Sequence, residues 1–156
     1  MITDSAFIPE LIGVNATIKI AKIGKRIWDD RNFTISNISN ELLGATLFHT
    51  NCERTRVNAS IVSNKNAEIF IALSDNFDNE DVMNALKKDN WTLRSEIYLE
   101  GKDNFGCKEI LNKVWSKKTN AGDTVPVLLD LNAGPWKLFM KSGYLVVAIL
   151  IKEGIF

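Results

Sequence analysis

The sequence predicts an all-β protein: an antiparallel two-sheet β-sandwich of jelly-roll type with one short helix. Apolar side chains recur at every second position in about nine short segments, which is the spacing of a strand with one buried face. These segments follow one another at intervals of roughly 10–15 residues. Turn-forming Asn, Asp, Gly and Lys lie between them, a pattern typical of sandwiches and barrels.

Individual strands can be assigned from this alternation. Leu93–Leu99 alternates most regularly, because Leu93, Ile97 and Leu99 share one side. Ile69–Leu73 and Tyr144–Ile151 are apolar on both faces, which predicts a place in mid-sheet or an outer face covered by another element or subunit. In chain order the predicted strands are Thr17–Ile23, Ala45–Thr50, Val57–Val62, Ile69–Leu73, Leu93–Leu99, Ile110–Lys117, Thr124–Leu129, Trp136–Phe139 and Tyr144–Lys152.

One segment has helical spacing instead. Asn79–Asp89 places apolar residues three and four positions apart, with Asn79 as N-cap and acidic residues in the first turn. The segment predicts a helix of two to three turns. Ile38–Leu43 carries a weaker helical pattern.

Length and composition indicate one globular domain. The 156 residues predict a single sandwich, 1–156, in which 1–15 form an N-terminal extension. The 19 basic and 19 acidic residues balance, which argues against nucleic acid as a partner. The longest apolar run, Leu145–Ile151, is too short for a membrane span. Met1–Ile12 has no basic start and is not expected to be a secretory signal.

The cysteines and the N-glycosylation triplets indicate whether the protein is extracellular or cytoplasmic. Cys52 and Cys107 pair in only one way, and a disulfide between them fits a secreted protein. Several N-x-S/T triplets favour an extracellular glycoprotein, while an asparagine-rich genome is the alternative. We therefore predict an extracellular location and keep a cytoplasmic one open. The triplets begin at Asn15, Asn32, Asn37, Asn58 and Asn90.

No catalytic machinery is predicted. The single histidine, His49, has no partnered nucleophile motif and is interpreted as structural or surface. Phosphate-binding glycine loops are absent from the sequence, and no cofactor is expected. The oxygens of Asp75–Asp81 are of the type that calcium prefers. Helix capping explains that segment equally well, so no metal is predicted.

Aromatic residues among polar neighbours are the more informative feature. Trp115 has Lys113 and Lys117 two positions away on either side, which predicts a ring on a partly solvent-exposed face of the sheet. Tyr98 lies in the same way between Glu96 and Glu100. Such rings can stack on a sugar or form a protein–protein hot spot. The alternative is a ring in the core, or one covered by a loop or by lysine methylenes.

Several short motifs follow one another in the order found in a known type of domain. Over about residues 16–150 the sequence resembles a β-sandwich accessory domain found at the ends of large secreted bacterial enzymes that act on polysaccharides. It departs from that pattern near Asp89–Trp91 and at Asn104–Cys107. The matching segments are Ile27–Phe33 (IWDDRNF), Leu42–Thr46 (LLGAT), Ala67–Asp75 (AEIFIALSD), Asn90–Trp91, Gly122–Val125 (GDTV) and Met140–Val147.

Three further tryptophans have assigned places. Trp28 belongs to the W-D-D-R segment and is interpreted as a loop anchor, with Arg31 paired to a carboxylate such as Asp75. A ligand-binding role for Trp28 stays open, because loops at the ends of sandwiches often hold ligands. Trp91 and Trp136 are expected to plug the ends of the sandwich.

The leading functional hypothesis is a non-enzymatic, lectin-like carbohydrate-binding module. The alternative is a structural or assembly domain that forms homo-oligomers through exposed aromatics and the apolar C-terminal strand, Tyr144–Phe156. The predicted ligand-binding residues are Trp115, Tyr98, Lys113, Lys117, Trp28 and Asp75.

Overall fold

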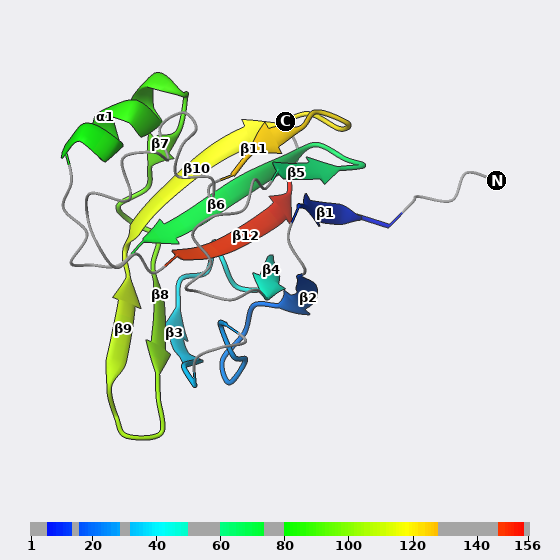
Figure 1. Ribbon diagram of the computed structural model, residues 1–156. Helices are drawn as coiled ribbons and strands as arrows, with labels where there is room; N and C mark the ends of the chain where they lie inside the picture. The colour runs from blue at the N-terminus through cyan, green and yellow to red at the C-terminus, as the bar shows by residue number, and fades with distance from the viewer. Residues whose placement is uncertain are drawn as a thin grey trace.

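A computed structural model describes residues 6–13, 16–28, 32–49, 60–73, 80–127 and 147–154 (Figure 1). The predicted class is confirmed: these residues form antiparallel β-sheets and one short helix. The elements are β1 (Pro9–Ile12), β2 (Thr17–Ile20), β3 (Thr34–Ile38), β4 (Thr46–His49), β5 (Ser60–Ser63), β6 (Ala67–Leu73), α1 (Glu80–Lys88), β7 (Thr92–Leu93), β8 (Leu99–Lys102), β9 (Lys108–Leu111), β10 (Lys113–Thr119), β11 (Val125–Pro126) and β12 (Val147–Glu153).

The described strands form three sheets, where the sequence predicted two. A central sheet has the order β2-β4-β12-β6-β10-β7, and the smaller sheets are β1-β5-β11 and β3-β8-β9. Alternate residues of the central strands belong to two separate buried clusters, one shared with β5, β11 and α1 and the other with β3, β8 and β9. The smaller sheets therefore cover opposite faces of the central one. A third layer is needed because the central strands are apolar on both faces.

Strands β6 and β12 lie inside the central sheet, as their two apolar faces predicted. In β6, Ile69 and Ile71 face one buried cluster while Phe70 and Ala72 face the other. Strand β12 pairs with β4 on one side and with β6 on the other. Strand β12 therefore has a hydrogen-bonded neighbour on each side, at Leu150 and Ile151 toward β4 and along its whole length toward β6. Homo-oligomer formation through Tyr144–Phe156 stays a prediction.

The first strand falls within the segment expected to be an extension. Pro9–Ile12 pairs antiparallel with β5, placing Leu11 opposite the buried Ile61. Proline is tolerated here because it is the first residue of an edge strand. The alternation rule missed this strand because its inward residues are a buried proline, Pro9, and Leu11, while Ile12 is exposed.

Two predicted strands are each divided between sheets. Leu93–Leu99 breaks after β7, where Ile97 N donates to the Arg94 carbonyl in a turn, and the chain resumes as β8 in another sheet. Ile110–Lys117 breaks at Asn112, between β9 and β10. Period-two alternation continues across both breaks. The sequence pattern therefore does not mark where the chain changes sheets.

Helix α1 confirms the predicted helix. Leu86 is fully buried and Met83 packs against the same cluster as Trp91 and Trp115. The helix ends where Trp91 N donates to the Leu86 carbonyl and Asn90 adopts a φ of 68°, a left-handed conformation that asparagine tolerates. The weaker helical pattern at Ile38–Leu43 corresponds to a single turn that follows β3.

None of the helices in the described part of the chain is long and apolar enough to cross a membrane.

Candidate functional site

Two of the predicted ligand-binding aromatics lie in the core. Trp115 is 1% exposed and belongs to the cluster formed with Leu86 and Trp91, so the expectation of a partly wet ring is corrected. Strand alternation did place Lys117 on the same side, but α1 and Trp91 cover that side. Trp28 is also 1% exposed and meets Phe33 edge-to-face, with ring centroids 6.3 Å apart. This packing agrees with its interpretation as an anchor.

The other predicted ligand-binding residues differ in their exposure and lie in different parts of the structure. Tyr98 is 36% exposed and precedes β8. Lys113 and Lys117 are half-buried. Lys117 Nζ donates to the Asp89 carbonyl at 2.9 Å and lies 5.8 Å from the centre of the Trp91 ring. Asp75, with Arg31 and Trp136, lies outside the described residues. The structure therefore does not gather the predicted set into one site.

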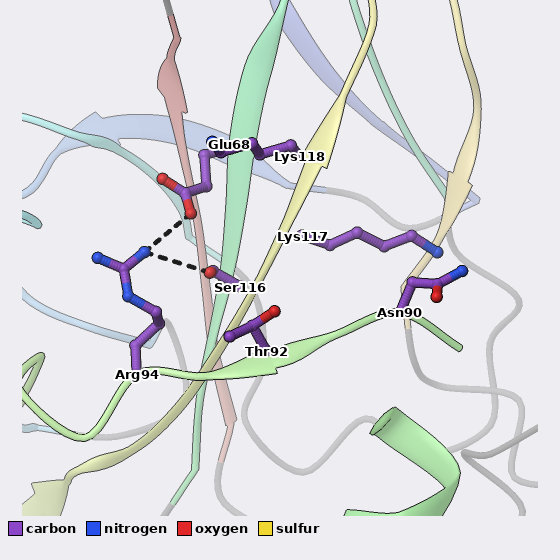
Figure 2. Close-up of a pocket in the computed structure, with 7 residues that line it drawn as sticks. All are labelled: Glu68, Asn90, Thr92, Arg94, Ser116, Lys117 and Lys118. Carbon is purple, nitrogen blue, oxygen red and sulfur yellow. Dashed lines mark hydrogen bonds and ion pairs between the residues drawn. The ribbon is translucent and has the colours of Figure 1, made fainter. Parts of the chain in front are cut away.

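A polar hollow at one end of the central sheet is the strongest candidate site (Figure 2). We call it the sheet-end hollow. Its volume is about 590 Å³, within the range of small-molecule sites. The residues that line it are Glu68, Asn90, Thr92, Arg94, Ser116, Lys117 and Lys118. Among the predicted ligand-binding residues that the structure describes, Lys117 alone lines the hollow.

The hollow forms where one face of the central sheet changes from apolar to polar. In β6 this face carries Phe70 and then Glu68, and in β10 it carries Val114 and then Ser116. Phe70 and Val114 pack in the cluster shared with β3, β8 and β9. The polar residues lie toward the other end of the same strands, so the third layer ends before it reaches them. Thr92 of β7 pairs with Ser116 and continues the polar surface.

Arg94 is the centre of the polar network. Its backbone N–H donates to the Val114 carbonyl at 2.7 Å, which fixes the residue beside β10 where the chain leaves the central sheet. Nη1 donates to Glu68 Oε2 at 2.9 Å and to the buried Ser116 Oγ at 3.4 Å (Figure 2). Nε donates to Glu96 Oε1 at 2.7 Å. Three contacts therefore hold the guanidinium in one orientation.

This network leaves hydrogen-bonding capacity for a ligand. Among the described residues nothing accepts from Arg94 Nη2, and nothing donates to Glu68 Oε1. Arg94 and Glu68 are only 28% and 22% exposed, so their charges are partly desolvated. The arrangement therefore combines rigid donors with a rigid acceptor, which suits the recognition of polar groups.

The opposite end of the hollow is built from the turn after α1. Figure 2 shows Asn90 and Lys117 at this end, Arg94 and Glu68 at the other, and Thr92 and Ser116 between them. The left-handed backbone of Asn90 closes the turn that precedes β7. Its exposed side-chain amide adds one donor group and one acceptor to the wall of the hollow.

The charges around Arg94 stabilise one another. Its hydrogen bond to Glu96 and the nearby carboxylates of Glu68 and Glu41 raise the pKa of Arg94 above its ordinary value. The pKa of Glu96 is lowered from its ordinary 4.5 by the backbone N–H of Glu96 and then by the Arg94 side chain. Both groups are therefore charged at neutral pH.

We expect Glu96 to stay ionised below its ordinary pKa. Because the pKa is lowered in the folded state, the stabilisation from this carboxylate is present above pH 4.5 and is lost as the pH falls through the lowered pKa. An NMR pH titration of the Glu96 carboxyl measures this shift. In Arg94→Gln the midpoint should move up toward 4.5, and the same midpoint in both proteins would contradict the assignment.

Other predicted features fall outside this hollow or outside the described residues. His49 is buried, as a structural histidine would be. Cys107 is exposed in the β8–β9 turn, whereas Cys52 and the calcium candidates of residues 75–79 are not described. No group of three or more His, Cys, Asp or Glu in the described ranges is placed to share a metal ion. Asn32 and Asn37 are exposed; Asn15 and Asn58 are not described.

Sequence reasoning missed most residues of the hollow. Glu68, Arg94 and Ser116 are separate in the chain, and each looks like an ordinary outward-facing residue of a strand or turn. A signal was nevertheless present: Glu68 shares a face of its strand with Phe70, and Ser116 shares a face with Val114, so each polar residue stands two positions from an apolar one. The pairing register that aligns these polar positions was not available from the sequence.

Fold and geometry together define a class: an antiparallel β-sandwich with a polar hollow on its central sheet. No known protein family matches the sequence, and no curated protein matches it. Among solved structures, the chain is similar to part of a GH138 enzyme targeting pectin rhamnogalacturonan II, with a TM-score of 0.56 and 15% identity.

This structural similarity covers 94% of the chain and 16% of the enzyme. The chain therefore spans a small part of that protein's length, and at 15% identity the likeness shows the fold alone. It supports a β-rich domain of a kind found within a polysaccharide-targeting protein. The more specific resemblance to an accessory domain has no family match behind it.

Proposed function

We propose that the protein is a non-enzymatic carbohydrate-binding module whose ligand occupies the sheet-end hollow. One observation carries this proposal: several hydrogen-bonding groups that can still bind a ligand lie around the same hollow. They are Arg94 Nη2, Glu68 Oε1, the Thr92 hydroxyl and the Asn90 amide. Sugar hydroxyls both donate and accept hydrogen bonds, so they complement such a mixed set. The similarity in fold to part of a pectin-targeting enzyme agrees with this proposal.

Binding is favoured over hydrolysis by the state of the carboxylates. A glycosidase needs one carboxyl group with a raised pKa to act as the acid. Glu68 and Glu96 are both ion-paired with Arg94, and the pKa of Glu96 is lowered. These groups are suited to accept hydrogen bonds from a ligand.

Arg94→Ala is expected to weaken glycan binding at least tenfold. Hydrogen bonds to a charged group contribute about 1.5–3 kcal/mol each, and about 1.4 kcal/mol corresponds to tenfold in affinity. The measurement is a glycan-array screen of the wild-type protein, followed by calorimetric titration of the best ligand into each variant.

A second variant and a control support that experiment. Asn90→Gly removes the amide while keeping the left-handed turn, since glycine adopts positive φ freely, and it should also weaken binding. Arg26→Ala removes an exposed guanidinium that bonds to Asn32, outside the hollow, and should bind as the wild type does. Wild-type protein that binds no glycan, or an Arg94→Ala variant with undiminished affinity, would overturn the proposal.

Asn90 links the hollow to the predicted glycosylation. It lines the hollow and also begins one of the N-x-S/T triplets. An N-linked glycan at Asn90 would therefore compete with a bound ligand. If the protein is extracellular, as we propose, binding should be measured on material whose occupancy at Asn90 has been determined by mass spectrometry.

The second candidate is an assembly domain. It is favoured by Ile18 and Ile20, which are about half-exposed on β2, an edge strand of the central sheet. Exposed apolar edge strands tend to associate. Light scattering separates the two candidates, because assembly requires a mass above 17.5 kDa.

A further inference from the structure

The described residues that line the sheet-end hollow carry more positive than negative charge. Three cations line it, Arg94, Lys117 and Lys118, and Glu68 is the one carboxylate among them. The whole chain balances its 19 basic against 19 acidic residues, so this excess belongs to one part of the surface. A concave site lined mainly by one sign of charge concentrates ligands of the opposite sign.

The carboxylates that pair with two of these cations lie outside the lining. Glu96 contacts Arg94 Nε and Asp89 contacts Lys117 Nζ, at 2.7 and 3.7 Å. The side chains of Glu96 and Asp89 are 54% and 42% exposed, so water and salt screen their charges. Glu41 acts on Arg94 less than either Glu68 or Glu96 does, and it does not line the hollow. A ligand inside the hollow therefore meets the cations at closer range than these acids.

Glu68, the one carboxylate of the lining, is itself surrounded by positive charge. Its Oε2 accepts from Arg94 Nη1 at 2.9 Å. On the sheet it lies directly opposite Lys118 of β10 and Lys152 of β12, and side chains at such positions are close neighbours on one face. Much of the negative charge of Glu68 is therefore already compensated.

Arg94 has the geometry to hold an anion. A guanidinium has five N–H donors, and the contacts with Glu68, Ser116 and Glu96 are made by Nη1 and Nε. The Nη2 donors are left for a ligand, on a group whose orientation these contacts already fix. A hydrogen bond from guanidinium to carboxylate is roughly twice as strong as one between neutral groups.

A sugar that carries a carboxylate complements this lining. Its carboxylate can accept from Arg94 Nη2 near the Lys118 ammonium, while a hydroxyl of the same ring donates to Glu68 Oε1. A neutral sugar offers only hydroxyls and forms weaker hydrogen bonds with the cations. An anion without a donor, such as sulfate, would bring negative charge against Glu68 and leave Oε1 without a hydrogen bond.

We propose that the sheet-end hollow prefers sugars that carry a carboxylate to neutral sugars, and that Arg94 and Lys118 bind the carboxylate. The inference rests on the proposed carbohydrate-binding function. Lys118 is the better residue for a test, because its side chain is exposed and Arg94 keeps its contacts with Glu68, Ser116 and Glu96 when Lys118 is replaced.

The test compares polymers that differ only in charge. Soluble β-1,4-galactan and galactomannan are titrated beside the same polymers after oxidation of their primary hydroxyls to carboxylates. We expect the wild type to bind the oxidised polymers at least fivefold more tightly than the neutral ones. In Lys118→Gln, which keeps much of the side-chain length and removes the charge, this ratio should fall at least threefold.

The control is Lys102→Gln, which removes one exposed lysine from β8, in another sheet. It lowers the net charge of the protein by the same amount but should leave the ratio unchanged. Salt gives a second measurement on the wild type. Affinity for the oxidised polymers should fall at least threefold between about 50 and about 200 mM NaCl, because charge on the ligand is neutralised by the protein. Affinity for the neutral polymers should change less than twofold.

The outcomes separate this inference from the proposed function. If neither array glycans nor polymers bind, the carbohydrate-binding function fails and the inference fails with it. If the neutral polymers bind as tightly as the oxidised ones, or more tightly, binding stands and the preference for a carboxylate is overturned. If Lys102→Gln lowers the ratio as much as Lys118→Gln does, the oxidised polymers bind through the general charge of the surface, and the assignment to the hollow is wrong.

Discussion

Trp115→Ala is expected to lower the free energy of unfolding by about 3–5 kcal/mol, the usual cost of truncating a large core aromatic. The ring is 1% exposed and packs in the cluster that joins the central sheet to Leu86 of α1 and to Trp91. Neighbouring elements on that face cannot fully fill the space that the indole leaves. Chemical denaturation followed by circular dichroism measures the change.

The control for Trp115 is Tyr98→Ala. Tyr98 is 36% exposed, so its loss should cost only a small part of that amount. Trp115→Phe should fold and should keep the glycan affinity of the wild type, because the ring does not line the sheet-end hollow. If Trp115→Ala cost less than about 1 kcal/mol, or if Trp115→Phe lost binding while remaining folded, the core assignment would be wrong.

Trp28→Ala is expected to have a similarly large effect, again about 3–5 kcal/mol. Trp28 is 1% exposed in the cluster between the central sheet and β3, β8 and β9. Its edge-to-face contact with Phe33, at an interplanar angle of 84°, should add about 0.5–1.5 kcal/mol beyond the buried area. A double-mutant cycle with Phe33→Leu measures that coupling.

Phe105→Ala is the matched control for Trp28. Phe105 lies in the β8–β9 turn and is 91% exposed, so its removal should change stability by no more than about 0.5 kcal/mol. A coupling near zero between Trp28 and Phe33 would mean that the two rings do not pack as described. Equal costs for Trp28→Ala and Phe105→Ala would likewise count against burial of Trp28.

Part of the fold could be predicted because it depends on local rules. A strand that is apolar at every position, such as Ile69–Leu73, must have both faces covered, and β6 does. Helical spacing with an N-cap at Asn79 identified α1 to within a residue at each end. Each of these follows from the periodicity of side-chain direction along one element.

The strand boundaries were less predictable. Leu93–Leu99 looked like one strand, but Arg94–Ile97 is a turn between two sheets. The alternation of apolar and polar residues can continue through a turn when the strand before the turn and the strand after it pack against different buried clusters. The sequence has no local marker for such a crossing, because either arrangement buries Ile97 and Leu99.

The burial of the tryptophans also could not be predicted without the tertiary structure. Two lysines beside Trp115 suggested a wet face, and the half-buried Lys117 does reach toward the surface. Long lysine stems can lie along apolar surface while their ammonium groups stay near water. Neighbouring lysines therefore do not indicate whether a ring between them is exposed; here the helix and Trp91 cover it.

By itself the sequence determined the all-β class, the short helix and the strands with two apolar faces, since these depend on the periodicity of single segments. Tertiary structure alone decided the third sheet, the burial of Trp28 and Trp115, and the sheet-end hollow. Glu68, Arg94 and Ser116 come together through the pairing of β6, β7 and β10. Such a register is set by contacts between segments far apart in the chain, which no local pattern specifies.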